Sequence, residues 1–260
     1  MKPLRVLAVL FALLAVSDFL KPFATSAQTG FVFMGRRLDG TPNLIAGWSF
    51  AVLLAWYAAS LWREKAAALP IGIAYAGYVS ANLFLFTLRM PPPATDAQKV
   101  FGIVYTAVAL GGAWGSVWLM LRAGLGRQDA APGRVLLRSF ALLFAWMALS
   151  DALKPFAYTP ETGFVLFGQR LAGTPNTISA LAFSALLATY AWNIWNERRA
   201  ALGLGLCYAA YVLANLVLWN VRQPPANQPP LVFALPYLAS AIGVSSGSAL
   251  LLWRHRGRLG

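Results

Sequence analysis

Apolar stretches of roughly 20 residues alternate with short polar segments along the whole chain, and that is the length with which an α-helix crosses a bilayer. In lipid the backbone hydrogen bonds must close within each segment, and these stretches are too long and too apolar for barrel strands. The pattern predicts an all-α integral membrane protein with eight transmembrane helices, over residues 4–23, 42–62, 68–88, 100–122, 137–156, 175–195, 201–221 and 231–253.

The same pattern occurs twice in the sequence. Residues 5–92 align with residues 138–225 without a gap, and more than half of the aligned pairs are identical. The segment DFLKPF at 18–23 returns as DALKPF at 151–156, and GTPN at 40–43 returns at 173–176. We therefore predict two tandem four-helix repeats, over residues 1–122 and 135–260, joined by a cytoplasmic linker over residues 123–134.

An even number of helices per repeat makes both repeats enter the membrane from the same side. The repeats are then related by a pseudo-two-fold axis along the membrane normal. The side with both termini and the predicted linker carries thirteen of the 21 Lys and Arg residues, and the opposite side carries eight. The positive-inside rule therefore places both termini in the cytoplasm, in a multi-pass protein of a bacterial-type inner membrane.

Composition narrows the classes of function. The chain is 59% apolar and 11% charged, with a net charge of +13. The orientation rule explains most of this charge, and no soluble basic domain is present to bind nucleic acid. A single cysteine and a single histidine exclude an intramolecular disulfide, a Cys-rich metal site and the usual histidine-based catalytic or haem sites. We expect no metal, no cofactor and no catalytic residues, and membrane lipid as a partner.

Polar side chains gather on one stripe of the third predicted helix. Polar groups inside a membrane span are costly and face protein or water. Spacings of three, four and seven place the following residues on that stripe: Tyr75, Tyr78, Asn82 and Arg89, repeated as Tyr208, Tyr211, Asn215 and Arg222. The end of the first helix and the loop after it add Asp18, Lys21 and Arg37, repeated as Asp151, Lys154 and Arg170.

Two interpretations of these residues stay open. In the structural one, Asp18 pairs with Lys21 or Arg89, and the tyrosines and the asparagine join helices by hydrogen bonds. In the functional one, the cations form a basic vestibule for an anionic solute or lipid head group, and the stripe lines the path below it. One acid per repeat cannot neutralise all the cations, and this favours the second interpretation.

Other segments predict packing. The two longest loops, 24–41 and 157–174, have apolar centres, so we expect a short stretch in each that lies in the interface or folds back on the helices. Glycines four apart at 111 and 115, and at 243 and 247, allow close helix packing in the fourth helix of each repeat. Cys207 aligns with Ala74 and is expected to be a small core residue.

Two motifs carry a resemblance to a known family. Leu-Lys-Pro-Phe closes the first helix, and Gly-Phe-Val followed by Gly-x-Arg-Leu-x-Gly-Thr-Pro-Asn opens the second. With these two motifs each half resembles the DoxX-type small membrane proteins. Those are four-helix bacterial proteins, and some of them are subunits of quinone-linked oxidoreductases. The present chain departs from that pattern by tandem fusion. The resemblance implies a four-helix unit and an accessory-subunit role, and no site residue is carried over.

The sequence thus favours a polytopic inner-membrane protein that binds or transports a small anionic or amphipathic molecule through a site in its extracytoplasmic half. The alternative is a non-catalytic structural subunit of a larger membrane complex, respiratory or quinone-linked, with other membrane proteins as partners. A membrane enzyme ranks third among the interpretations, because the sequence lacks the usual nucleophile–base sets and metal ligands.

Overall fold

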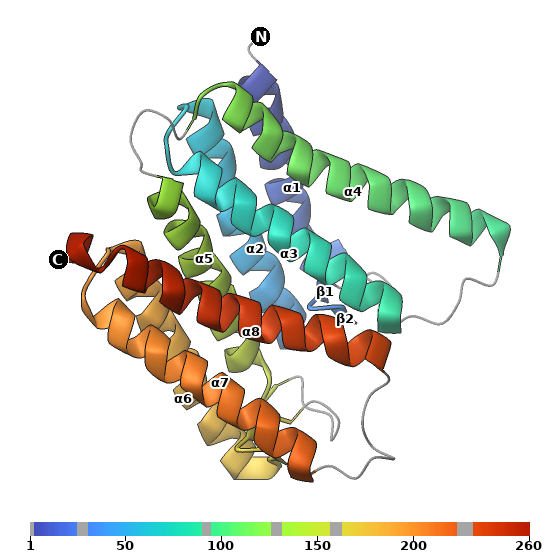
Figure 1. Cartoon of the computed structure of the whole chain (residues 1–260). Helices are drawn as coiled ribbons and strands as arrows, with labels where there is room; N and C mark the ends of the chain where they lie inside the picture. The colour runs from blue at the N-terminus through green and yellow to red at the C-terminus, as the bar shows by residue number, and fades with distance from the viewer. Residues whose placement is uncertain (1–2, 25–30, 90–94, 126–131, 157–162, 223–230) are drawn as a thin grey trace. The chain divides into compact units, whose positions relative to one another are not determined.

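Eight long helices make up most of the chain (Figure 1). The computed structural model describes residues 3–24, 31–89, 95–125, 132–156, 163–222 and 231–260. The helices are α1 (Pro3–Ala24), α2 (Gly40–Trp62), α3 (Ala68–Arg89), α4 (Asp96–Arg122), α5 (Pro132–Leu153), α6 (Gly173–Trp195), α7 (Ala200–Arg222) and α8 (Leu231–Arg254). They divide between two compact units, Met1–Val135 (unit 1) and Leu136–Gly260 (unit 2).

The helices identify a polytopic membrane protein. Seven of them, α1 to α7, contain a stretch that is long and apolar enough to cross a membrane. The eighth, α8, is not among the seven, and the first side chains of α8 lie outside the described residues. The all-α membrane class is confirmed, whereas the count of eight spans and the symmetry between the repeats remain predictions.

The helix boundaries follow the apolar pattern closely, with two differences. Helix α4 begins at Asp96, four residues before the predicted start, and α5 covers 132–153 in place of 137–156. Helix α5 therefore begins inside the predicted linker, 123–134, since proline is tolerated in the first turn of a helix. Residues 126–131 of that linker lie outside the described residues, and the division into two repeats and a linker remains a prediction.

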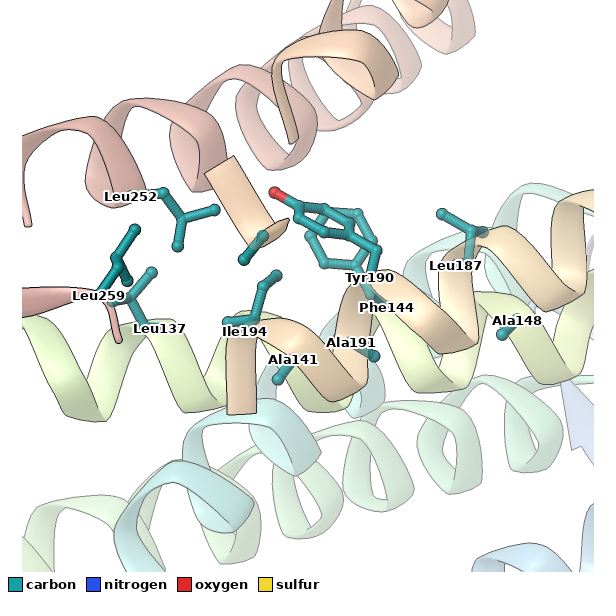
Figure 2. Packing of buried hydrophobic residues seen from close by; sticks show 11 residues of the cluster. Leu137, Ala141, Phe144, Ala148, Leu187, Tyr190, Ala191, Ile194, Leu252 and Leu259 are labelled. Carbon is teal, nitrogen blue, oxygen red and sulfur yellow. The ribbon is translucent and has the colours of Figure 1, made fainter. Parts of the chain in front are cut away.

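The core of unit 2 is an aromatic and aliphatic cluster to which α5, α6, α7 and α8 contribute (Figure 2). The rings of Phe144 and Tyr190 lie against each other with centroids 4.6 Å apart. The Tyr190 hydroxyl shares a buried hydrogen bond of 3.0 Å with Ser248 on α8. Side chains that fill a core without voids hold helices together by dispersion, which matters in lipid because the hydrophobic effect does not drive helices together there.

Unit 1 repeats this arrangement. Phe11 lies 4.5 Å from Tyr57, and the Tyr57 hydroxyl shares a hydrogen bond of 2.9 Å with Ser116 on α4. Gly72 leaves the room for this hydroxyl, because a Cβ at Gly72 would lie 2.6 Å from Tyr57 Oη. Ser116, which directly follows the predicted glycine pair of α4, thus joins α2 to α4. Cys207 is exposed, so the prediction of a core position for it is wrong.

A two-stranded hairpin precedes the second helix of each unit. In unit 1 it consists of β1 (Val32–Phe33) and β2 (Arg36–Arg37), and in unit 2 of β3 (Val165–Leu166) and β4 (Gln169–Arg170). Both pairs are antiparallel, with Phe33 opposite Arg36 and Leu166 opposite Gln169. The expectation of a short segment that folds back on the helices is confirmed, and the segment is a β-hairpin.

Candidate functional site

The hairpin and the helix ends around it bring together most of the residues singled out by the sequence. We call this region of each unit the hairpin end. In unit 1 the turn residues Met34 and Gly35 have φ values of 49° and 73°. Positive φ at both central residues defines the type I′ turn, which matches the natural twist of a hairpin. A methionine in this region costs about 1 kcal/mol, so other contacts must hold the turn.

Gly35 sets how closely the hairpin approaches α3. A Cβ at Gly35 would lie 2.5 Å from Leu85 Cβ and 2.6 Å from the Leu85 carbonyl carbon. The turn therefore rests directly on the helix backbone. Only glycine combines the positive φ with this approach, because it has no Cβ.

The predicted polar stripe binds the hairpin backbone. Asn82 Oδ1 accepts a hydrogen bond of 2.8 Å from the Gly35 N–H, and Asn82 Nδ2 donates to Val32 O at 3.2 Å. Tyr78 Oη donates to the same Val32 carbonyl at 3.3 Å. Arg89 Nη1 donates to Met34 O at 2.7 Å. These bonds satisfy the backbone groups of the turn, which would otherwise lack partners against an apolar helix.

Unit 2 makes the asparagine, arginine and tyrosine contacts again at the aligned positions. Asn215 Oδ1 accepts from the Gly168 N–H at 2.9 Å, and Arg222 Nη1 donates to Phe167 O at 2.8 Å. Tyr211 Oη donates to Val165 O at 3.2 Å. Gly168 again lies against the backbone of α7, at Leu218. The stripe of each unit is therefore a clamp for its own hairpin.

Sequence reasoning missed the asparagine that closes the base of each hairpin. Asn43 Oδ1 accepts a hydrogen bond of 2.7 Å from the Phe31 N–H, and Asn176 does the same for Phe164 at 2.7 Å. Both asparagines are buried, at 5% and 1% exposed. The signal was present, because each lies in the repeated GTPN motif near the start of its helix.

The first tyrosine of each stripe has a different role. Tyr75 packs in the aromatic core, 5.4 Å from the ring of Phe11 and 5.9 Å from the ring of Phe50. Tyr208 likewise lies 5.6 Å from Phe144. The helix period places Tyr75 and Tyr208 on the predicted face. They lie nearer the start of the helix than the residues that contact the hairpin, so they pack in the core instead.

The acid of each unit pairs with the lysine three residues later. Lys21 Nζ lies 2.6 Å from Asp18 Oδ1, and Lys154 Nζ lies 2.6 Å from Asp151 Oδ1. The Asp18 side chain is only 7% exposed, whereas that of Lys21 is 44% exposed. Each lysine also lies over a phenylalanine at the base of the hairpin, Phe31 at 5.9 Å or Phe164 at 5.0 Å. The buried carboxylate is thus neutralised by an amine that reaches the surface.

The remaining arginines are on the hairpin strands. Arg37 is exposed, and Arg170 lies over the Trp219 ring of α7 with its Cζ 5.3 Å from the ring centroid. Arg36 is half-buried, and Gln169 takes its place in unit 2. Each unit therefore presents exposed cations at its hairpin end, beside a carboxylate that is already paired.

Within the described part of the chain, no group of three or more His, Cys, Asp or Glu side chains is placed to hold a metal ion. The chain matches no protein-family model, no curated protein and no solved structure.

Proposed function

We propose that this polytopic membrane protein binds a small anionic or amphipathic molecule at its hairpin ends, on the extracytoplasmic side of a bacterial-type inner membrane. The observation that carries the proposal is the surplus of positive charge there. In unit 1 the ion pair Asp18–Lys21 and the exposed pair Asp96–Lys99 leave one further acid among the described residues of the hairpin end, Asp39, against three arginines, Arg36, Arg37 and Arg89. Cations in excess of acids attract anions, and a low-dielectric surrounding strengthens the attraction.

The hydrogen bonds that anchor the hairpin support binding in preference to passage. Tyr78, Asn82 and Arg89 are each hydrogen-bonded to the hairpin backbone, which favours a role in holding a binding surface over a role in lining a path. A platform that is ordered before the ligand arrives loses less entropy on binding.

The proposal includes the arrangement of the units. Helix α8 carries no charged residue from Leu231 to Trp253 and is 24 residues long, which fits an eighth span. Eight spans give both repeats the same orientation, related by a pseudo-two-fold axis, and bring both hairpin ends to one side of the membrane. Both termini then lie in the cytoplasm, as the distribution of basic residues favours.

Photo-crosslinking tests the proposed function. The full chain in liposomes of neutral lipid is exposed to a diazirine-labelled fatty acid, or to the matching alcohol of equal chain length. We expect the acid to label residues of the hairpin end, and unlabelled laurate to compete where dodecanol does not. Equal labelling by acid and alcohol, or labels spread along the helices, would refute the proposal.

The second candidate is an accessory subunit of a larger membrane complex, the role that the resemblance to DoxX-type proteins implies. The observation that favours it is the first half of α4. Several of its apolar side chains are largely exposed, among them Val100, Ile103, Val104 and Val108 at 60%, 70%, 54% and 69%. Purification in mild detergent with a partner in fixed proportion would support this role. A lone monomer that retains the anionic probe would count against it.

A further inference from the structure

Two arginines meet at the turn of the unit 1 hairpin. Arg89 donates to the Met34 carbonyl at 2.7 Å, and Arg36 is two residues further along the same turn. Arg36 is directly opposite Phe33 in the hairpin, and side chains of an opposed pair lie on one face of the sheet. Phe33 is buried with its ring 6.1 Å from that of Tyr78, so this is the face toward α3 and Arg89.

Arg89 binds the turn at Met34, and Arg36 flanks the same turn on the face toward α3, so two like charges meet there and repel each other. Among the residues that the structure describes, neither is paired with a carboxylate, and Arg89 makes one hydrogen bond, through Nη1. Arg89 is exposed and Arg36 is half-buried, so the remaining donors of both can be reached from outside the unit. Two like charges at one turn, neither of them ion-paired with a carboxylate of the described residues, favour an anion between them.

We propose that Arg36 and Arg89 form a binding site for a phosphate-type oxyanion in unit 1. This inference rests on the proposed function and names the chemical class of its ligand. Guanidinium groups present planar pairs of donors that match the oxygens of phosphate, and charge-assisted hydrogen bonds of this kind are the strong ones. Two sources offer this chemistry: the phosphate group of a lipid head group, and free inorganic phosphate.

Unit 2 lacks the second arginine, because Gln169 stands where unit 1 has Arg36. Its Arg222 makes the same contact to the turn, at 2.8 Å from Phe167 O. Within the described residues the paired arginines are therefore a feature of unit 1 that unit 2 does not repeat. The difference between Arg36 and Gln169 also supplies the test. The hairpin of each unit shows that the fold accepts the residue that the other unit carries at this position.

The experiment compares three variants of the full chain in neutral nanodiscs: R36Q, R37Q and Q169R. R36Q introduces the residue that unit 2 already carries, so the fold is expected to be kept. R37Q removes the same charge from Arg37, which lies opposite Val32 and therefore on the other face of the hairpin. Q169R places an arginine in unit 2 where unit 1 has one.

Inorganic phosphate and phosphatidylglycerol are the two probes, measured by thermal shift and by native mass spectrometry respectively. For the probe that binds, we expect R36Q to weaken binding at least tenfold, about 1.4 kcal/mol, and R37Q to weaken it less than threefold. Q169R raises the number of bound molecules per chain from one to two. If inorganic phosphate binds in neutral lipid and R36Q weakens that binding, the ligand is a soluble phosphate. If only phosphatidylglycerol binds in this way, the ligand is a lipid head group.

Equal losses in R36Q and R37Q would show diffuse attraction and overturn the site. No loss in R36Q would overturn it as well. If the unmodified chain still binds the photoreactive fatty acid in that case, the proposed function stands and only this site falls. If the unmodified chain binds none of the anionic probes, both proposals fail together.

Discussion

Replacing Asn82 with alanine is expected to release the unit 1 hairpin from α3 while leaving the helices folded. Asn82 makes two hydrogen bonds to the hairpin, at 2.8 Å and 3.2 Å. Each contributes about 1 kcal/mol net, and the N–H of the buried Gly35 is left without its acceptor, so the docked state loses roughly 2 kcal/mol. That loss corresponds to about a 30-fold larger population of the undocked hairpin.

Cysteine labelling measures this population. Leu38 is 7% exposed at the end of the hairpin, and Cys207 is the only native cysteine. In a C207A background, a cysteine introduced by Leu38→Cys reacts with maleimide only when the hairpin opens, so its rate follows the open population. We expect N82A to raise the rate about 30-fold.

The matched control is N215A in the same background. It removes the equivalent contact to Gly168 in unit 2, at 2.9 Å, and leaves the unit 1 hairpin untouched. We expect the introduced cysteine of the N215A variant to react at the same rate as in the background protein that lacks this substitution. A folded N82A variant with the parent rate would show that the asparagine does not hold the hairpin, and the clamp would be disproved.

Three further predictions concern the core and the ion pair of unit 1. G72A places a methyl group 2.6 Å from Tyr57 Oη, so we expect roughly 1–3 kcal/mol of destabilisation, seen as a lower Tm in detergent; an unchanged Tm would contradict the packing. Y57F removes the 2.9 Å bond to Ser116, and a double-mutant cycle with S116A is expected to give a coupling of about 1 kcal/mol, whereas additive effects would show that the two hydroxyls do not interact. K21Q lowers the Tm more than D18N, because K21Q strands a carboxylate that is 7% exposed, while D18N leaves an amine that is 44% exposed and reaches water; the reverse order would refute the assignment.

The helices were predictable because their cause is local. A run of roughly 20 apolar residues is enough to specify a membrane helix, and the observed limits of α2, α3, α6 and α7 lie within two residues of the predicted ones. The pairing of Asp18 with Lys21 was also accessible, since residues three apart are neighbours on a helix.

The role of the polar stripe was only half predictable. Helix periodicity places Tyr78, Asn82 and Arg89 on one face, and this is correct. Their partners are the backbone groups of Val32, Met34 and Gly35, and a backbone carbonyl leaves no trace in the sequence. The hairpin itself was hidden because its turn is Met-Gly, which lacks the Asn-Gly or Asp-Gly signature of a type I′ turn.

Contacts between distant helices were the least accessible. The bond between Tyr57 and Ser116 joins residues 59 positions apart, and the two types of residue are common in membrane helices for other reasons. Glycine 72 shows no pattern of its own until the hydroxyl beside it is located.

The clamp also has a consequence for the order in which the protein is assembled. Its hydrogen bonds join residues 46 to 55 positions apart, so the turn at Met34 and Gly35 is synthesised well before Asn82 and Arg89. A nascent chain that holds only the first two helices has the Asn43 contact at the base of its hairpin but no contact that holds the turn. Docking of the turn is therefore a late step that waits for the third helix to be inserted, and a ribosome stalled before residue 82 would carry a hairpin more reactive to maleimide than that of the N82A variant, which keeps the Tyr78 and Arg89 contacts.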